Sequence, residues 1–174
     1  ASNLDFTITP STPLMVTGAN AVGKSSLFRA MGSLWEVKKG HIDRPCDDRG
    51  SLNIKDIFLV PQRVYMVLGS LGDQITYPLI IRKEKRTKAD EDKMLNCLKL
   101  VGIDFLVKRE NGFDTVKKWE DTLSLGEKQR LAMFRLFFHK PSFGVLDECT
   151  SAVSQDVEEN LYKNANKDGI TSIT

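Results

Sequence analysis

The sequence predicts an α/β domain with a largely parallel sheet. Short apolar runs alternate with longer stretches in which apolar residues recur every three or four positions, the spacing of an amphipathic helix. A glycine-containing loop joins the first apolar run to the first of these helices, as in a parallel βαβ unit. The 174 residues, 41% of them hydrophobic, suffice for one domain with a sizeable core.

Four segments have the composition of buried strands. Gly18 follows the first, and Pro61, which lacks the N–H that a sheet needs, follows the second. The third runs into two acidic residues, Asp147 and Glu148. The expected strands are residues 13–17, 56–60 and 143–146, and the start of a fourth at 169–174.

Helices are expected between these strands. The first covers Lys24–Met31, directly after the loop. A later one, at residues 126–138, has apolar side chains over most of its surface, and another includes residues 157–162. The alternation of these helices with the strands favours crossover connections and hence a parallel sheet.

A further helix is expected to begin near Thr87. Asp90 follows three residues later, so the two can form a capping box. The dense basic cluster at residues 82–86 comes just before and is followed at once by acids, which is typical of a solvated loop leading into a helix. The apolar residues that share one face of this helix are Met94, Leu98 and Val101.

Net charge, the length of apolar runs and cysteine content exclude several classes of protein. The net charge is only +2, so no nucleic-acid partner is expected. No apolar run approaches the ~18 residues of a membrane span, and no signal peptide precedes the first strand. Cys46, Cys97 and Cys149 have no metal-ligand spacing and predict a reducing compartment. The chain begins with Ala1 and ends within an apolar run, which suggests a fragment of a longer protein.

Residues 18–25 match the phosphate-binding pattern G-x-x-x-x-G-K-[ST]. Glycines let the backbone curl so that successive N–H groups point at phosphate oxygens, and the following helix presents its positive end to the same anion. Lys24 supplies a positive charge for the β- and γ-phosphates, and the Ser25 hydroxyl can ligate Mg²⁺. The expected nucleotide-binding residues of this loop are Gly18, Ala19, Asn20, Ala21, Val22, Gly23, Lys24, Ser25 and Ser26.

Acidic and amide side chains follow two of the expected strands. Asp147 and Glu148 come out at the end of the third strand, where ligands bind in α/β sheets. Asp147 can hold Mg²⁺, and Glu148 can polarise a water for attack on the γ-phosphate. Gln62 follows the second strand, and its amide can reach both the metal ion and the attacking water. Glu148 and Gln62 are the candidate catalytic residues, and Ser25, Gln62 and Asp147 the candidate Mg²⁺ ligands.

The segment "LSLGEKQR" at residues 123–130 predicts a second anion-binding helix start. Because the chain already has one phosphate loop, this second site makes sense if it contacts the γ-phosphate of a nucleotide held by another copy. Two such composite sites imply an ATP-dependent dimer. The expected nucleotide contacts here are Ser124, Leu125, Gly126 and Glu127.

Taken together, these segments resemble the nucleotide-binding domain of an ATP-binding cassette (ABC) ATPase, a P-loop NTPase-type fold. Its Walker A loop, Q-loop glutamine, signature, Walker B strand and following glutamate occur in that family's order over nearly the whole chain. Four stretches resemble the D subfamily, the adrenoleukodystrophy-protein type: "GKSSLFRAMGSLW", "VPQRVYMVLGSLGDQITYP", "LSLGEKQRLAMFRLFFHKP" and "LDECTSAVSQDVE".

The resemblance implies a partial nucleotide-binding domain over residues 1–174. Its core would be residues 1–62 and 141–174, and its helical, signature-bearing subdomain about 63–140. It further implies ATP and Mg²⁺ as cofactors, and as partners a second nucleotide-binding domain packed head to tail and the transmembrane domain of the full-length chain. Residues 63–71 would be the surface that couples the two domains.

Members of this subfamily are mainly half-transporters that import very-long-chain fatty acids or their CoA esters into peroxisomes. The resemblance therefore implies an ATPase on the cytosolic face of the peroxisomal membrane. The isolated fragment is expected to have weak activity or none. The family's adenine-stacking aromatic would lie before Ala1, and its switch histidine would follow Thr174.

Several residues depart from the family's pattern. Ala19 and Ala21 replace the usual Pro and Gly, and Ala21 would cost about 1 kcal/mol if its φ is positive. Leu125 stands where most signatures have Gly, and Gly72 where relatives usually have Arg. Ser154 replaces a frequent Asp and, like Cys149, suits the D subfamily.

Three alternatives remain beside this interpretation. The chain could come from a soluble ABC ATPase of translation, DNA repair or chromosome structure. It could come from a lysosomal, cobalamin-handling relative within the D subfamily. It could also be a pseudo-ATPase that binds nucleotide but turns it over poorly, which the departures at Ala21 and Leu125 suggest.

Overall fold

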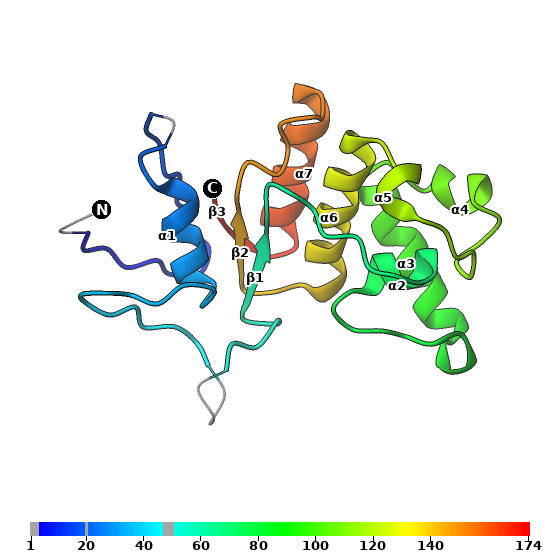
Figure 1. Ribbon diagram of the computed structural model, residues 1–174, viewed down its shortest axis with the longest axis horizontal. Coiled ribbons are helices and arrows are strands. Elements are labelled where there is room, and N and C mark those ends of the chain that lie inside the picture. The colour runs from blue at the N-terminus through cyan, green and yellow to red at the C-terminus, as the bar shows by residue number, and fades with distance from the viewer. Residues whose placement is uncertain (1–3, 20, 47–50) are drawn as a thin grey trace.

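The computed structural model describes residues 4–19, 21–46 and 51–174. Within these residues, three parallel strands form a sheet in the order β1 (Ile57–Val60), β2 (Phe143–Leu146) and β3 (Thr171–Ile173) (Figure 1). Val60 of β1 pairs with Leu146 of β2, so the carboxyl ends of these two strands meet at one edge. The α/β class and the parallel sheet expected from the sequence are confirmed.

The first expected strand, residues 13–17, is present only as a short pairing at the edge of the sheet. Leu14 forms a parallel bridge with Ile173 of β3. The Leu14 amide donates to the Ser172 carbonyl over 3.0 Å, and the Thr174 amide donates to the Leu14 carbonyl over 2.9 Å. The segment lies where the sequence predicts a strand, but its ladder is too short to form a regular one.

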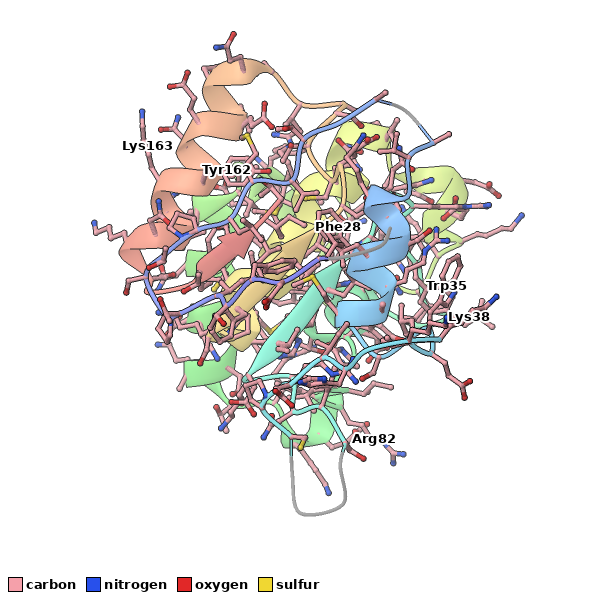
Figure 2. The ribbon with its side chains drawn as sticks, turned by 90° about the vertical axis from the view of Figure 1, so that its left-hand side faces the viewer. Phe28, Trp35, Lys38, Arg82, Tyr162 and Lys163 are labelled. Carbon is pink, nitrogen blue, oxygen red and sulfur yellow. The ribbon has the colours of Figure 1, made fainter. Side chains whose placement is uncertain are left out.

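Helices cover both faces of the sheet (Figure 1). On one face lies α1 (Lys24–Met31), whose Phe28 and Met31 pack with Val145 and Ile173. Figure 2 shows Phe28 between this helix and the sheet. On the other face lie α6 (Leu125–His139) and α7 (Gln155–Lys167). Because successive strand residues point to opposite faces, Val145 faces α1 while its neighbour Leu146 packs with the core around α6.

α6 is the central helix of the molecule. It lies between the sheet and α3 (Lys88–Leu100), and most of its residues are buried, which agrees with the apolar side chains expected over most of its surface. It begins one residue earlier and ends one residue later than the expected 126–138. The expected capping box of α3 is confirmed, because Thr87 and Asp90 bond reciprocally.

Short elements connect β1 to α6 and were not foreseen, because each is too brief to show a hydrophobic period. Ser70 and Asp73 form a capping box at the first of them. These elements are α2 (Leu71–Thr76), the 3₁₀ turn η1 (Lys83–Lys85), α4 (Phe105–Arg109) and α5 (Trp119–Thr122). They form the helical side of the molecule in Figure 1, and their buried residues share one core with β1, β2, α6 and α7.

The basic cluster at residues 82–86 is only partly the solvated loop that the sequence suggests. Arg82 is exposed at the surface (Figure 2). The Arg86 side chain, in contrast, is 4% exposed and forms ion pairs with Asp114 and Glu91. Its guanidinium lies against Gly72, where an added Cβ would come 2.9 Å from Arg86 Nη1. Sequence pattern could not reveal this burial, because Asp114 lies 28 residues away and only Glu91 is near in sequence.

Candidate nucleotide-binding site

The phosphate loop connects the edge of the sheet to α1. Gly23, the last loop residue, has a φ of 101° and caps the helix. Ala21 has a φ of 64°, the left-handed region that a Cβ disfavours by roughly 1–2 kcal/mol. The condition under which Ala21 was expected to be strained is therefore met. Asn20, also expected to bind nucleotide, lies outside the described residues.

Lys24 folds back over its own loop. Its Nζ donates to the carbonyl oxygens of Gly18, over 2.9 Å, and of Ala19, over 3.2 Å. Both bonds are exposed to solvent, so their contribution to stability is small. The ammonium group is thus held at the mouth of the loop, where a phosphate oxygen can replace the two carbonyl acceptors.

Because β1 and β2 end at the same edge of the sheet, Ser25 of the phosphate loop lies beside the residues that follow them. Ser25 at the start of α1 donates from Oγ to Asp147 Oδ1 over 2.8 Å. Asp147 is 6% exposed, and its amide donates to the Val60 carbonyl over 2.9 Å. Two oxygen ligands of the kind that Mg²⁺ prefers therefore lie side by side, and this donor set fits the ion.

Gln62 and Glu148 meet at the same edge. Gln62 Nε2 donates to Glu148 Oε2 over 2.8 Å, and both residues are exposed. Glu148 has a φ of 46°, which turns its side chain out of the strand direction. The neighbouring Cys149 is buried, and burial raises the pKa of its thiol to about 12, so this thiol stays protonated and does not act as a nucleophile.

The signature segment forms the beginning of α6. Ser124 caps the helix: its Oγ accepts the Glu127 amide N–H, and its own amide donates to Glu127 Oε2 over 2.8 Å. Leu125 is 59% exposed. Gly126 must be glycine, since a Cβ there would lie 2.9 Å from the Ala152 carbonyl oxygen.

The signature helix is also tied to the loop after Glu148. Gln129 accepts the Ala152 amide N–H at Oε1 over 2.7 Å and donates from Nε2 to Ser151 Oγ over 2.9 Å. Among residues 4–19, 21–46 and 51–174, no hydrogen bond or ion pair joins the phosphate loop to Ser124–Glu127. The two sets of residues expected to bind anions are therefore separate in one chain.

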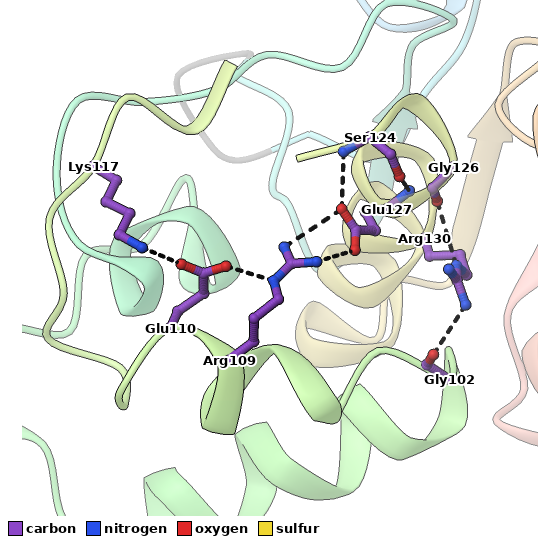
Figure 3. A network of polar contacts seen from close by, with 8 residues as sticks. All are labelled: Gly102, Arg109, Glu110, Lys117, Ser124, Gly126, Glu127 and Arg130. Carbon is purple, nitrogen blue, oxygen red and sulfur yellow. Dashed lines mark hydrogen bonds and ion pairs between the residues drawn. The ribbon is translucent and has the colours of Figure 1, made fainter. Parts of the chain in front are cut away.

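Glu127 faces the protein interior, where ion pairs engage its carboxylate (Figure 3). Arg109 Nη1 donates to Glu127 Oε1 over 2.6 Å, and Arg109 Nε donates to Glu110 Oε1 over 2.6 Å. Burial alone raises the pKa of Glu127, but the bonds from Arg109 and Ser124 outweigh it and hold this pKa below its usual range. Sequence reasoning missed Arg109 and Glu110, because no motif marks them.

Of residues 63–71, expected to be a coupling surface, residues 63–70 form a loop and Leu71 is the buried first residue of α2; buried side chains hold the loop's backbone. Leu68 in this loop is 99% exposed and Tyr65 is 60% exposed. Three buried side chains donate to carbonyl oxygens of the loop: Arg135 Nη1 to Tyr65 over 2.9 Å, Gln74 Nε2 to Val67 over 2.7 Å, and Trp119 Nε1 to Gly69 over 2.8 Å. The loop thus presents apolar side chains on a fixed backbone.

Comparisons with known proteins place the chain in a family. Residues 1–151 match the family model described as ABC transporter. ATP-binding cassette sub-family D member 3 of Rattus norvegicus is 45% identical over 99% of this chain and 25% of its own length, and sub-family D member 1 of Drosophila melanogaster is 46% identical over 98% and 23%. The lysosomal cobalamin transporter ABCD4 of Mus musculus is 35% identical over 99% of this chain and 28% of its own length.

The fold has a solved counterpart in a bacterial Atm1-family ABC exporter with ATP bound, with a TM-score of 0.72 and 22% identity over 95% of this chain and 30% of that chain. The chain spans about a quarter of the length of the curated sub-family D relatives that it matches. Among the helices that the structure describes, none has the length and apolarity to cross a membrane. The chain therefore belongs to the ABC transporter family, as an ATPase domain whose curated relatives include members of sub-family D.

Proposed function

We propose that this chain binds and hydrolyses ATP as one half of a head-to-tail dimer, and that this hydrolysis drives a peroxisomal half-transporter that imports very-long-chain fatty acids or their CoA esters. The observation that carries the ATPase part is the convergence of Ser25 with Asp147 and of Gln62 with Glu148, each over 2.8 Å, at the carboxyl edge of the sheet. The transported substrate and the peroxisomal location rest on the resemblance to the adrenoleukodystrophy-protein type.

Each site residue has a role in this proposal. The loop residues 18–26 surround the phosphates, and Lys24 neutralises their charge. Ser25 and Asp147, with Gln62, would hold Mg²⁺, which supplies charge neutralisation at the β- and γ-phosphates. Glu148 accepts a proton from the attacking water, and Gln62 orients that carboxylate and the water. Residues 124–127 of the second copy approach the γ-phosphate.

The division of the chain into a nucleotide-binding core and a helical subdomain is part of this proposal. We place the nucleotide-binding core at residues 1–62 and 141–174 and the signature-bearing subdomain at about 63–140. Residues 63–71, at the start of this subdomain, would contact the transmembrane domain. Their fixed backbone and the exposed Leu68 support this, because a pre-organised apolar loop loses little entropy when a partner helix docks.

Substitution of Glu148 by Gln tests the catalytic proposal. In the complete gene product we expect Glu148→Gln to leave ATP affinity unchanged and to lower hydrolysis by about 100-fold or more, because the general base is lost while the phosphate contacts remain. Calorimetry with ATP and a phosphate-release assay measure the two quantities. Equal turnover in mutant and parent would contradict the assignment of Glu148.

A weakly active nucleotide-binding protein is the second candidate function. The positive φ of Ala21 and the exposed Leu125 in place of Gly favour it. The rate of single-turnover hydrolysis by the parent dimer separates the two candidates, since a pseudo-ATPase would bind ATP but release phosphate much more slowly than an ordinary ABC ATPase. Stimulation of that turnover by a very-long-chain acyl-CoA, and not by cobalamin, would support the proposed substrate class.

A further inference from the structure

Arg109 lies between two buried carboxylates (Figure 3). It belongs to α4, and its guanidinium bonds Glu127 Oε1 and Glu110 Oε1, each over 2.6 Å. The Glu127 side chain is 10% exposed and that of Glu110 is 3% exposed, whereas that of Arg109 is 40% exposed. Lys117 Nζ holds the second oxygen of Glu110 over 2.6 Å. Two cations thus balance two carboxylates in one row.

The position of Glu127 decides the geometry of the signature. Its Oε2 accepts the Ser124 amide N–H, while its own amide N–H is bonded to Ser124 Oγ. These two bonds fix where the Ser124 hydroxyl and the first N–H groups of α6 point. Arg109 donates from Nη1 to the other oxygen, Oε1, over 2.6 Å, and from Nη2 to Oε2 over 3.5 Å. A buried carboxylate without this partner would have to move or take up a proton, and the capping box would change with it.

We propose that Arg109 is a positioning residue for the nucleotide site of the opposite subunit: through Glu127 it fixes the signature groups that contact the γ-phosphate held by the partner's phosphate loop. This inference rests on the proposed function. Arg109 touches no nucleotide itself. Glu110, which Lys117 neutralises, holds the guanidinium in place from the other side.

Mixed dimers test this role, because a lesion at the signature acts on the other subunit's nucleotide. In the complete gene product, one arrangement carries Arg109→Ala and Lys24→Ala on the same chain, beside a parent chain. Both composite sites are then damaged. The other arrangement carries the two substitutions on different chains, and one site keeps both its parent phosphate loop and its parent signature.

The amount of nucleotide trapped by vanadate in each dimer is the measurement. We expect the different-chain dimer to trap as much as a dimer with Lys24→Ala alone on one chain, and the same-chain dimer to trap at least about tenfold less. Equal trapping in the two arrangements would overturn the role of Arg109, since a general loss of folding acts irrespective of pairing. No trapping by the parent dimer would instead overturn the proposed function.

A second comparison tests whether Arg109 acts through Glu127. Glu127→Gln keeps a capping oxygen without a charge. The fold-loss of turnover caused by Arg109→Ala should therefore be at least about fivefold smaller in the Glu127→Gln background than in the parent. Arg109→Lys should restore part of the turnover, because an ammonium can reach one carboxylate. Lys108→Ala, which removes an exposed charge from the same helix, should leave turnover unchanged. Equal losses with and without Glu127→Gln would contradict the proposal.

Discussion

The two regions proposed to bind the nucleotide's phosphates, the phosphate loop and the signature end of α6, are built differently. Among the described residues of the phosphate loop, Lys24 bonds two carbonyls of its own loop in solvent, and Ala21 is held at a positive φ. The signature end of α6 is held by a reciprocal capping box, by Arg109, and by the bonds from Gln129 to the loop after Glu148.

The difference indicates which half adapts to the nucleotide. In the phosphate loop, phosphate oxygens can take over acceptor positions that the loop's own carbonyls occupy. At the signature, the groups are already in place before a partner arrives, so docking costs little further ordering. Nucleotide affinity should therefore depend on the loop, and turnover on the precision of the signature.

The largest expected effect is on affinity. Lys24→Ala should weaken ATP binding by about 4 kcal/mol, or roughly a thousandfold, because two charge-assisted bonds to phosphate are lost. The free energy of unfolding without nucleotide should barely change, since the bonds of Lys24 in this state are exposed. Calorimetry and chemical denaturation measure the two. Unchanged affinity would rule out the phosphate-loop role.

The signature should show the opposite pattern. In Gly126→Ala the new Cβ meets the Ala152 carbonyl oxygen at 2.9 Å, and backbone must shift to relieve the contact. We expect turnover to fall roughly 100-fold, which is typical of a displacement near 1 Å in a reacting geometry, while ATP affinity of the single domain stays within about threefold. A steady-state assay of the dimer, with thermal melting as the folding control, measures this. A proportional loss of affinity would contradict the division of roles.

The sequence predicted the phosphate loop in more detail than the signature's surroundings. Residues 18–25 are one contiguous motif, and the strand ends near Gln62 and Asp147 follow from short apolar runs, the stop at Pro61 and parallel pairing. The capping box of α3 was likewise local. Arg109 lies 18 residues from Glu127, and the two side chains meet only in the folded chain. Such long-range pairs have no periodic or motif signal.

The strain at Ala21 offers a smaller test. Ala21→Gly removes a Cβ from a residue with a φ of 64°. The free energy of unfolding should rise by about 1 kcal/mol, partly offset by the larger chain entropy of glycine in the unfolded state. ATP affinity should rise by no more than about fivefold. Ala19→Gly is the matched control, because Ala19 has no positive φ and should gain nothing. If turnover also rises in Ala21→Gly, the strained loop limits the enzyme.

The smallest expected effect is the pH dependence of stability contributed by His139, the last residue of α6. His139 is 8% exposed, and its Nε2 lies 2.9 Å from the Tyr77 carbonyl oxygen. Burial, helped by the charges of Lys93 and Arg135, lowers its pKa, although the carbonyls of Tyr77 and Thr76 act against this. The neutral ring is therefore favoured in the folded state.

A depressed pKa at a histidine gives stability that is complete above the usual pKa of 6.5 and is lost as pH falls toward the folded-state value. From pH 7.5 to 5.5 the free energy of unfolding should fall by less than about 1.4 kcal/mol per pH unit, the limit for one proton. Denaturant titrations at several pH values measure this. His139→Gln should flatten the dependence, because no proton is then taken up on unfolding at this position. His41→Gln should leave it intact, since the His41 side chain is 83% exposed. An identical slope in His139→Gln would show that α6 is not stabilised through this ring.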